Sequence, residues 1–329
     1  MREFGYAAPA DVPAVLSRKA ATPAARYYGG GTTLFDLMKL GVEGPVSVID
    51  VTRCDALQTL EAGRSEWRLG AAMTMADVAA DAALQREFPA LAESLWKAAS
   101  PQIRNMATLG GNLLQRTRCA YFRGTPAYAC NKREPGSGCS ALEGVNRGHA
   151  VLGGSEHCVA TYPGDLAVAL VAFDAVLELR SPRGPRTLAV IDLHREPGST
   201  PHLETTLADD ELIVAIRVPR APATRASVYH KVRDRESYAF ALASAAVGLQ
   251  MDGGRVVDVR IGLGGVATRP WRARAAERQL LGQPLTRESA RQAAESAFAE
   301  ARPLYHNRFK VALGIDVLTD ALMQSKARL

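Results

Sequence analysis

Cysteines are the residues of this sequence with the greatest capacity for chemistry, and four of the five gather in one stretch. Cys119, Cys130, Cys139 and Cys158 have the spacing C-x10-C-x8-C-x18-C, whereas Cys54 stands alone. Zinc modules usually pair their ligands roughly two to four residues apart. Ferredoxin-type clusters use C-x2-C-x2-C, and neither spacing occurs here. Because thiolate ligands need to meet only in space, the spacing leaves an iron–sulfur cluster, a zinc site and unligated or disulfide-paired thiols open.

Basic residues surround these cysteines and outnumber the nearby acidic Glu134, Glu143 and Glu156. The basic residues are Arg116, Arg118, Arg123, Lys132, Arg133 and Arg147. This positive surplus suits a cluster whose thiolates give it a net negative charge. A zinc site could instead recruit His149 or His157. Synthesis in a reducing compartment favours a metal site over two disulfides.

A glycine run forms a second candidate site. Gly29-Gly30-Gly31-Thr32-Thr33 follows the short strand expected at Arg26-Tyr27-Tyr28 and precedes a helical pattern. Without side chains the backbone can approach a phosphate closely, and the first N–H groups of a helix favour an anion. The run matches neither G-x-G-x-x-G nor the P-loop. A pyrophosphate cradle and an ordinary strand-to-helix turn are therefore both open.

A second glycine pair lies within Thr108-Leu109-Gly110-Gly111-Asn112. The glycines would admit a flat ring or a phosphate, and the Thr108 and Asn112 side chains could hydrogen-bond its polar edges. Taken alone, the pattern favours a bulge or tight turn. Two isolated charges have equally plain interpretations: Asp165 as a helix cap and Lys231 as a solvated basic residue.

The helices and strands that must position these residues can be predicted from the hydrophobic pattern, and together they indicate an α+β chain. We expect helices over 11–20 and 33–40 and strands over 26–28 and 46–50 in the first unit. Next come expected strands over 56–61 and 67–70, helices over 75–83 and 88–99, and an irregular stretch over 100–162. Order returns with a helix over 165–173 and strands over 175–179 and 211–218. The Pro-rich residues 219–222 are the predicted domain boundary. Beyond it we expect strands over 227–232, 240–251 and 255–262 and helices over 270–281, 287–301 and 307–324.

Composition excludes several classes of protein. The 329 residues are 47% hydrophobic and 22% charged, as in an ordinary globular protein. Forty Lys and Arg against thirty-four Asp and Glu give +6, too small and dispersed an excess to predict nucleic-acid binding. The uncharged runs are shorter than the roughly 20 residues that cross a bilayer, so membrane insertion is not expected. The first residues lack the apolar core of a secretory signal, which predicts synthesis without a signal peptide of its own.

In combination, these motifs resemble the flavoprotein subunits of the xanthine oxidase family of molybdenum hydroxylases. Gly29 to Thr32, Ile103-Arg104-Asn105 and Thr108 to Asn112 stand in the order of that family's two FAD loops. The resemblance implies a two-part FAD-binding domain of the PCMH (vanillyl-alcohol-oxidase-like) type, followed by an α+β domain like that of CO dehydrogenase flavoproteins. The implied domains are 1–55, 56–222 and 223–329.

The same resemblance implies roles for the candidate residues. Residues 26–33 (Arg26, Tyr27, Tyr28, Gly29, Gly30, Gly31, Thr32 and Thr33) would hold the FAD pyrophosphate. Thr108, Gly110, Gly111 and Asn112 would lie along the isoalloxazine and its ribityl chain. Asp165 and Lys231 would contact the cofactor. The surroundings of the cysteines resemble the branch of periplasmic aldehyde oxidoreductases, whose flavin subunit also carries a [4Fe-4S] cluster. This implies that Cys119, Cys130, Cys139 and Cys158 hold such a cluster in a loop at about 115–160.

The branch also implies partners and a direction of electron flow. A large subunit with the molybdenum cofactor would oxidise an aldehyde, and a small subunit with two [2Fe-2S] clusters would pass electrons to FAD and on to an external acceptor. The heterotrimer would reach the periplasm with a signal-bearing partner; the alternative location is the cytoplasm. Two alternative functions stay open: a flavin subunit similar to that of 4-hydroxybenzoyl-CoA reductase, with inward electron flow, and a zinc- or cluster-stabilised scaffold without electron transfer.

Overall fold

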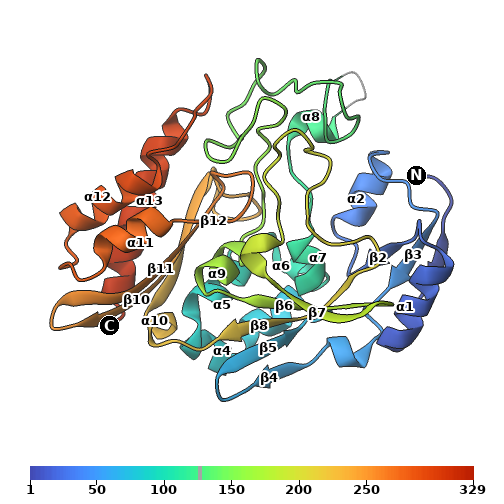
Figure 1. Cartoon of the computed structure of the whole chain (residues 1–329), viewed down its shortest axis with the longest axis horizontal. Coiled ribbons are helices and arrows are strands. Elements are labelled where there is room, and N and C mark those ends of the chain that lie inside the picture. The colour runs from blue at the N-terminus through green and yellow to red at the C-terminus, as the bar shows by residue number, and fades with distance from the viewer. Residues whose placement is uncertain (125–127) are drawn as a thin grey trace.

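The chain folds into three packed units with a long irregular segment above them (Figure 1). The computed structural model describes residues 1–124 and 128–329. Pro126, part of the predicted cluster loop, lies outside the described residues. Within them, no helix is both long and apolar enough to cross a membrane. The α+β class predicted from the sequence is confirmed, since each unit joins a sheet to helices.

The N-terminal unit is a small parallel sheet with the strand order β1-β3-β2. The strands are β1 (Gly5–Ala7), β2 (Arg26–Tyr28) and β3 (Ser47–Asp50), and the helices between them are α1 (Val12–Ala21) and α2 (Leu34–Lys39). Parallel neighbours need crossover connections, and the two helices supply them. α1 begins after Asp11 because that carboxylate accepts the Ala14 backbone N–H at 2.8 Å.

The middle unit is an antiparallel sheet with the order β4-β5-β8-β6-β7. Its strands are β4 (Leu60–Ala62), β5 (Glu66–Gly70), β6 (Val176–Ser181), β7 (Gly184–Ala189) and β8 (Leu212–Pro219). Its helices are α3 (Met75–Ala80), α4 (Ala82–Glu87), α5 (Pro89–Trp96), α6 (Pro101–Arg104), α7 (Leu109–Leu113) and α9 (Leu166–Ala172). Every residue of α9 is buried, so this helix forms the centre of the largest core.

The C-terminal unit packs three helices on a four-stranded antiparallel sheet ordered β12-β11-β10-β9. The strands are β9 (Ser227–Val232), β10 (Ala243–Asp252), β11 (Arg255–Gly264) and β12 (Trp271–Arg272). The short helix α10 (Pro222–Arg225) leads into it, and α11 (Arg274–Leu280), α12 (Arg287–Ala297) and α13 (Phe309–Lys326) close the chain. Its apolar core is separate from that of the middle unit, which makes it a second folding unit.

Several predicted elements differ from the structure. The strand expected over 56–61 is a 3-10 turn, Asp55–Leu57, followed by β4, because Leu57 turns inward to be buried. The single helix expected over 75–83 is divided at Asp81, whose carboxylate caps α4 through the Leu84 N–H at 2.7 Å. The strands β1, β7 and β12 were not predicted. The turn expected at 108–112 is the start of helix α7.

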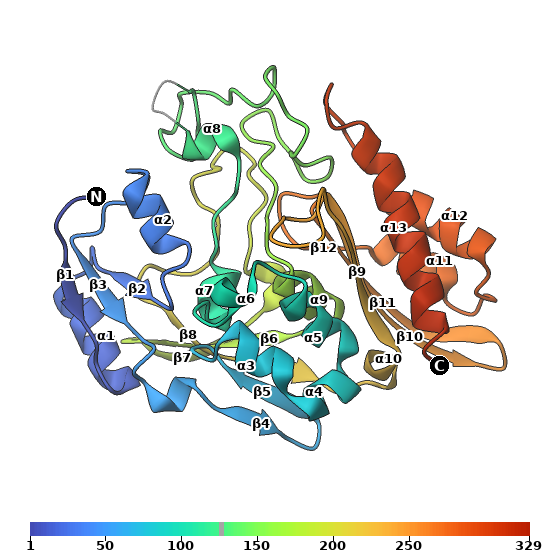
Figure 2. The same ribbon diagram turned by 180° about the vertical axis from the view of Figure 1, so that it is seen from behind.

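The cysteine-rich stretch rises between the N-terminal unit and the C-terminal unit, and it carries the short helix α8 (Ala120–Arg123) (Figures 1 and 2). Isolated bridges replace continuous strands there, including the antiparallel pair Cys130 and Cys139 and the pair Ser155 and Cys158. Two ion pairs from Arg118 and Arg123 to Asp36 tie the stretch to α2. The predicted irregular region is therefore ordered both by bridges within it and by ion pairs to another element.

Candidate cofactor site

A cavity of about 450 Å³ opens where the glycine loops, the end of α7 and the segment between β7 and β8 meet. Nine of the fourteen predicted cofactor residues line it: Arg26, Tyr27, Gly29, Gly31, Thr32, Thr33, Thr108, Gly110 and Gly111. Tyr28, Gly30, Asn112, Asp165 and Lys231 are not among its lining residues. The two glycine runs, about eighty residues apart in sequence, therefore form parts of one site.

The first glycine loop requires glycine for conformation and for space. Gly30 and Gly31 have φ of +78° and +70°, a left-handed region that other residues rarely adopt. A Cβ on Gly30 would overlap the Met106 carbonyl, and one on Gly31 would overlap the Tyr28 ring. This sharp turn keeps backbone atoms at the cavity surface, as a bound phosphate or ring requires.

Thr108 joins the two glycine loops. As the N-cap of α7, its hydroxyl accepts the Gly111 N–H at 3.2 Å and donates to the Gly29 carbonyl at 3.1 Å. A Cβ on Gly111 would lie 2.8 Å from the same carbonyl oxygen. The close approach of the two loops therefore depends on glycine at 111 and on a hydroxyl at 108.

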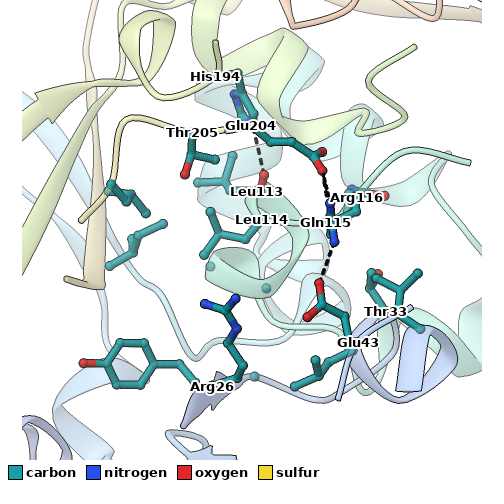
Figure 3. A pocket seen from close by; sticks show the side chains of 18 of the residues that line it. Arg26, Thr33, Glu43, Leu113, Leu114, Gln115, Arg116, His194, Glu204 and Thr205 are labelled. Carbon is teal, nitrogen blue, oxygen red and sulfur yellow. Dashed lines mark hydrogen bonds and ion pairs between the residues drawn. The ribbon is translucent and has the colours of Figure 1, made fainter. Parts of the chain in front are cut away.

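One wall of the cavity carries an arginine held by two carboxylates (Figure 3). Arg116 donates to Glu43 at 2.6 Å and to Glu204 at 2.7 Å, and Lys132 lies 3.5 Å from Glu204. Burial alone would lower the pKa of the Arg116 guanidinium, but Glu204 and Glu43 outweigh it and raise that pKa. Arg116 also lies over the Phe122 ring at 4.6 Å, so this network connects the cavity to the cysteine-rich stretch.

His194 presents a neutral imidazole beside the cavity. Its Nε2 lies 2.9 Å from the Leu113 carbonyl oxygen (Figure 3), which requires Nε2–H to donate and leaves Nδ1 as an acceptor. Burial lowers the pKa of His194 to about 4. Nδ1 and the Asn112 Oδ1 are buried and have no partner among the described residues. Such unpaired acceptors suit a ligand that brings its own N–H or O–H donors.

Asp165 and Lys231 meet in a buried ion pair outside the cavity. Lys231 Nζ lies 2.8 Å from Asp165 Oδ2, and the side chains are 1% and 5% exposed. The interpretations of Asp165 as a helix cap and of Lys231 as a solvated residue are wrong, since Asp165 caps no N–H group of α9. The Tyr229 hydroxyl donates to the other Asp165 oxygen at 2.6 Å. Burial and Asp165 raise the pKa of Tyr229 well above its usual value, so the phenol stays a donor.

The four clustered cysteines come together in one neighbourhood. Cys130 pairs with Cys139 across a bridge, the Cys158 thiol hydrogen-bonds Cys139, and Cys119 and Cys130 share a small apolar cluster with Phe122. No three His, Cys, Asp or Glu side chains of residues 1–124 and 128–329 close around a point where one metal ion could sit. Four sulfurs around one zinc would lie only about 3.8 Å apart. A [4Fe-4S] cluster binds each thiolate at a different iron and so needs a wider arrangement.

Backbone N–H groups point at these sulfurs. Ala160 N lies 3.4 Å from Cys158 Sγ, and backbone N–H groups act to lower the pKa of Cys119 (Phe122 and Tyr121) and of Cys139 (Ala141, Val159 and Leu142). Burial raises the pKa of Cys119 to about 11. The hydrogen bond from Cys158 lowers the pKa of Cys139 to about 6, while the pKa of Cys158 is raised. Donors of this kind stabilise thiolate ligands. Cys54 is fully buried and far from the group in sequence.

The sequence matches two families end to end. Residues 2–221 match the family described as the FAD binding domain in molybdopterin dehydrogenase, and residues 227–323 match the CO dehydrogenase flavoprotein C-terminal domain. The chain belongs to the FAD-binding subunits of the molybdenum hydroxylase (xanthine dehydrogenase) family. The resemblance inferred from the glycine motifs is thereby confirmed, as is the assignment to an oxidoreductase subunit.

Relatives within the family cover nearly the whole chain. The aldehyde oxidoreductase FAD-binding subunit PaoB of Escherichia coli is 45% identical over 309 residues, 93% of each chain. The carbon monoxide dehydrogenase medium chain of Afipia carboxidovorans is 27% identical over 99% of this chain and 97% of that one. The solved carbon monoxide dehydrogenase of Hydrogenophaga pseudoflava superimposes with a TM-score of 0.77 at 27% identity, covering 99% of this chain and 98% of that one.

Several residues of this cavity were not predicted from the sequence. Glu43, Arg116, His194 and Glu204 line the cavity, although Arg116 was noted for its charge beside the cysteines. Glu204 and His194 stand in an irregular segment without a motif, and their roles depend on contacts with residues more than eighty positions away. No local pattern of residue types could have identified them.

Proposed function

We propose that this chain is the electron-transfer subunit of a molybdenum-dependent aldehyde oxidoreductase and that it carries no substrate chemistry of its own. The observation that carries the proposal is the 45% identity, over 93% of both chains, with an aldehyde oxidoreductase FAD-binding subunit. The chain would take electrons from partner subunits and deliver them to an external acceptor. A flavin subunit with inward electron flow, like that of 4-hydroxybenzoyl-CoA reductase, is the alternative within the family.

The cavity residues would hold FAD. The exposed backbone of residues 29–33 would hold the pyrophosphate, and Thr108 to Asn112 would lie along the ring system. The unpaired Nδ1 of His194, which lines the cavity, would accept a hydrogen bond from a hydroxyl or amino group of the cofactor. When bound, FAD supplies a group that exchanges electrons singly or in pairs, with its potential tuned by nearby hydrogen bonds and charges.

A glycine substitution tests the cradle. Gly111→Val should greatly lower the ratio of FAD to protein, because its side chain would push the Gly29 carbonyl away from the loop contact. Gly44→Val is the matched control, since nothing lies within 4 Å of a Cβ at Gly44. FAD content is measured by absorbance after denaturation, with the thermal midpoint of each variant recorded alongside. Normal FAD occupancy in Gly111→Val would overturn the assignment of the two glycine loops as the FAD-binding cradle.

We propose further that Cys119, Cys130, Cys139 and Cys158 hold a [4Fe-4S] cluster, which supplies a one-electron carrier when bound. Three features support this: the convergence of the four thiols, the backbone N–H groups directed at them, and the basic residues nearby. The charge of Lys132 opposes the rise in the pKa of Cys158 that its hydrogen bond to Cys139 and its burial cause. The cluster loop also borders the FAD cavity through Arg116.

Anaerobic purification with iron, zinc and flavin assays tests the cluster and the scaffold alternative together. Iron with FAD supports electron transfer, whereas zinc without flavin would overturn it. Cys130→Ser and Cys139→Ser should lose iron and keep much of the flavin. Cys54→Ser is the matched control and should keep both, because Cys54 is packed in a different core. Unchanged iron in Cys130→Ser and Cys139→Ser would overturn the ligand assignment.

We also propose the assembly and its compartment. The chain would form a heterotrimer with a molybdenum-cofactor subunit and a small [2Fe-2S] subunit, and the folded complex would reach the periplasm through a signal on a partner. The relation to subunits of multisubunit dehydrogenases supports the assembly. Co-purification of all three chains through a tag on this one, from separated periplasm and cytoplasm, tests both points. Recovery of this chain alone, or of the complex in the cytoplasm, would overturn the corresponding point.

A further inference from the structure

Lys310 is a buried cation without a carboxylate partner. It lies at the start of α13, is 0% exposed, and donates to the carbonyl oxygens of His149, at 3.1 Å, and of Gly148 and Gly265. Among the described residues its ammonium contacts carbonyl oxygens and forms no ion pair, and residues 125–127 contain no acidic side chain. Burial and the charge of Arg147 lower the pKa of Lys310 to about 8, so the ammonium form prevails at neutral pH. An isolated buried charge is costly, which points to a negative group nearby.

His149 connects this cation to the cysteine group. Its carbonyl is held by Lys310 and by Asn307 Nδ2 at 3.3 Å, and the residue is 6% exposed. Its Nε2 lies 3.1 Å from the Cys119 sulfur. Nδ1 has no partner among the described residues. Because a Cys119 thiolate has no proton to donate, the hydrogen bond between the two requires His149 Nε2–H to be the donor.

We propose that His149 and Lys310 are positioning residues that raise the reduction potential of the cluster, an inference that rests on the proposed [4Fe-4S] site. Reduction adds one electron to the cluster, breaks no bond and makes the site more negative by one charge. A hydrogen bond to a ligand sulfur and a fixed positive charge both stabilise the more negative state. α13 of the C-terminal unit thus controls the electrostatics of a loop that belongs to the FAD-binding region.

Substitutions in the complete complex test this inference. Iron content is measured first, and the cluster midpoint potential is then measured by an EPR-monitored titration with dithionite. His149→Ala should shift the potential to a more negative value, and His149→Gln, which keeps a donor, should shift it less. Lys310→Met should also shift it negative, whereas Lys310→Arg should stay near the original value. His157→Ala is the matched control, since His157 is exposed beside Cys158 and no ring hydrogen bond is found for it among the described residues.

The outcomes separate this inference from the function on which it rests. Absence of iron in the unsubstituted complex would overturn the proposed cluster itself. Iron-loaded His149→Ala and Lys310→Met with unchanged potentials would overturn the inference alone. Loss of iron in His149→Ala with retention in His149→Gln supports the donor role. Loss of iron in both His149 variants, with FAD kept, would overturn it in favour of the imidazole as a ligand.

Discussion

His194 has a buried neutral ring whose Nδ1 has no partner in the part of the chain that the structure describes, and the burial of this ring makes the stability of the protein depend on pH. Burial lowers its pKa from 6.5 to about 4. Below pH 6.5, the pKa of this imidazole in the unfolded chain, the unfolded chain binds a proton that the folded chain does not. Stability should therefore be lost as the pH falls from about 6.5 to 4. The contribution amounts to as much as about 3 kcal/mol.

Urea unfolding between pH 7 and pH 4 checks this prediction. His194→Gln, whose amide can replace the hydrogen bond to the Leu113 carbonyl, should show a shallower loss of stability over that range. His202→Gln serves as the control, because His202 is exposed and lies in the same segment between β7 and β8. Identical pH profiles for His194→Gln and the unsubstituted protein would contradict the assigned role of burial.

Single residues differ in how far the sequence could predict them. The tight turn at Gly30 and Gly31 could be predicted from residue type alone. Both positions have a positive φ and no space for a Cβ, and only glycine satisfies both conditions. The sequence indicated a helix cap for Asp165 and a solvated charge for Lys231, because a sequence does not show which distant residue neutralises a charge. His194 and Glu204 could not be predicted for the same reason: their partners lie far along the chain.

At the scale of elements, helix caps and tertiary contacts together overrode the preference that the residue types indicate. α7 contains two glycines and reads as a turn, yet the Thr108 cap and the contact with the first loop hold it helical. The helix expected over 75–83 divides because Asp81 caps a new helix within it. The cysteine-rich stretch was predicted as irregular, but its order comes from ion pairs such as Arg118–Asp36 that no periodicity reveals.

Among the ion pairs of the cysteine-rich stretch, we expect those of Arg116 to contribute most to stability. Arg116→Met leaves Glu43 without its cation and Glu204 with Lys132 alone, in a partly buried place where their side chains are 18% and 22% exposed. We expect a loss of about 2 kcal/mol, between the values for surface and buried pairs. FAD affinity should fall with it, because Arg116 lines the cavity.

Denaturant unfolding and FAD titration of the apoprotein measure the two effects. Arg287→Met is the matched control, since its pair with Asp320 is exposed and should contribute less than about 0.5 kcal/mol. A variant Arg116→Met with unchanged stability and unchanged FAD affinity would show that the wall of the cavity does not depend on this network.

At the scale of the whole molecule, the middle and C-terminal units have separate cores, and a buried polar contact joins them. Asp165 at the start of α9 meets Lys231 and Tyr229 of β9 across this junction. The two units were predicted from the order of strands and helices, whereas the junction was not. Its energy depends on burial, since a carboxylate and an ammonium this deeply buried stabilise the fold only as a pair.

Asp165→Asn should therefore cost about 3 kcal/mol, because it leaves the Lys231 ammonium buried without a counter-charge. The double variant Asp165→Asn with Lys231→Met removes both charges and should recover much of that loss.

FAD titration of the same variants separates a structural role from the contact with cofactor implied by the family resemblance. If the pair serves only the junction, the double variant should regain FAD affinity along with stability. If the side chains also contact FAD, stability should return while affinity stays low. Equal losses of stability in the single and double variants would contradict the ion pair as the joint between the two units.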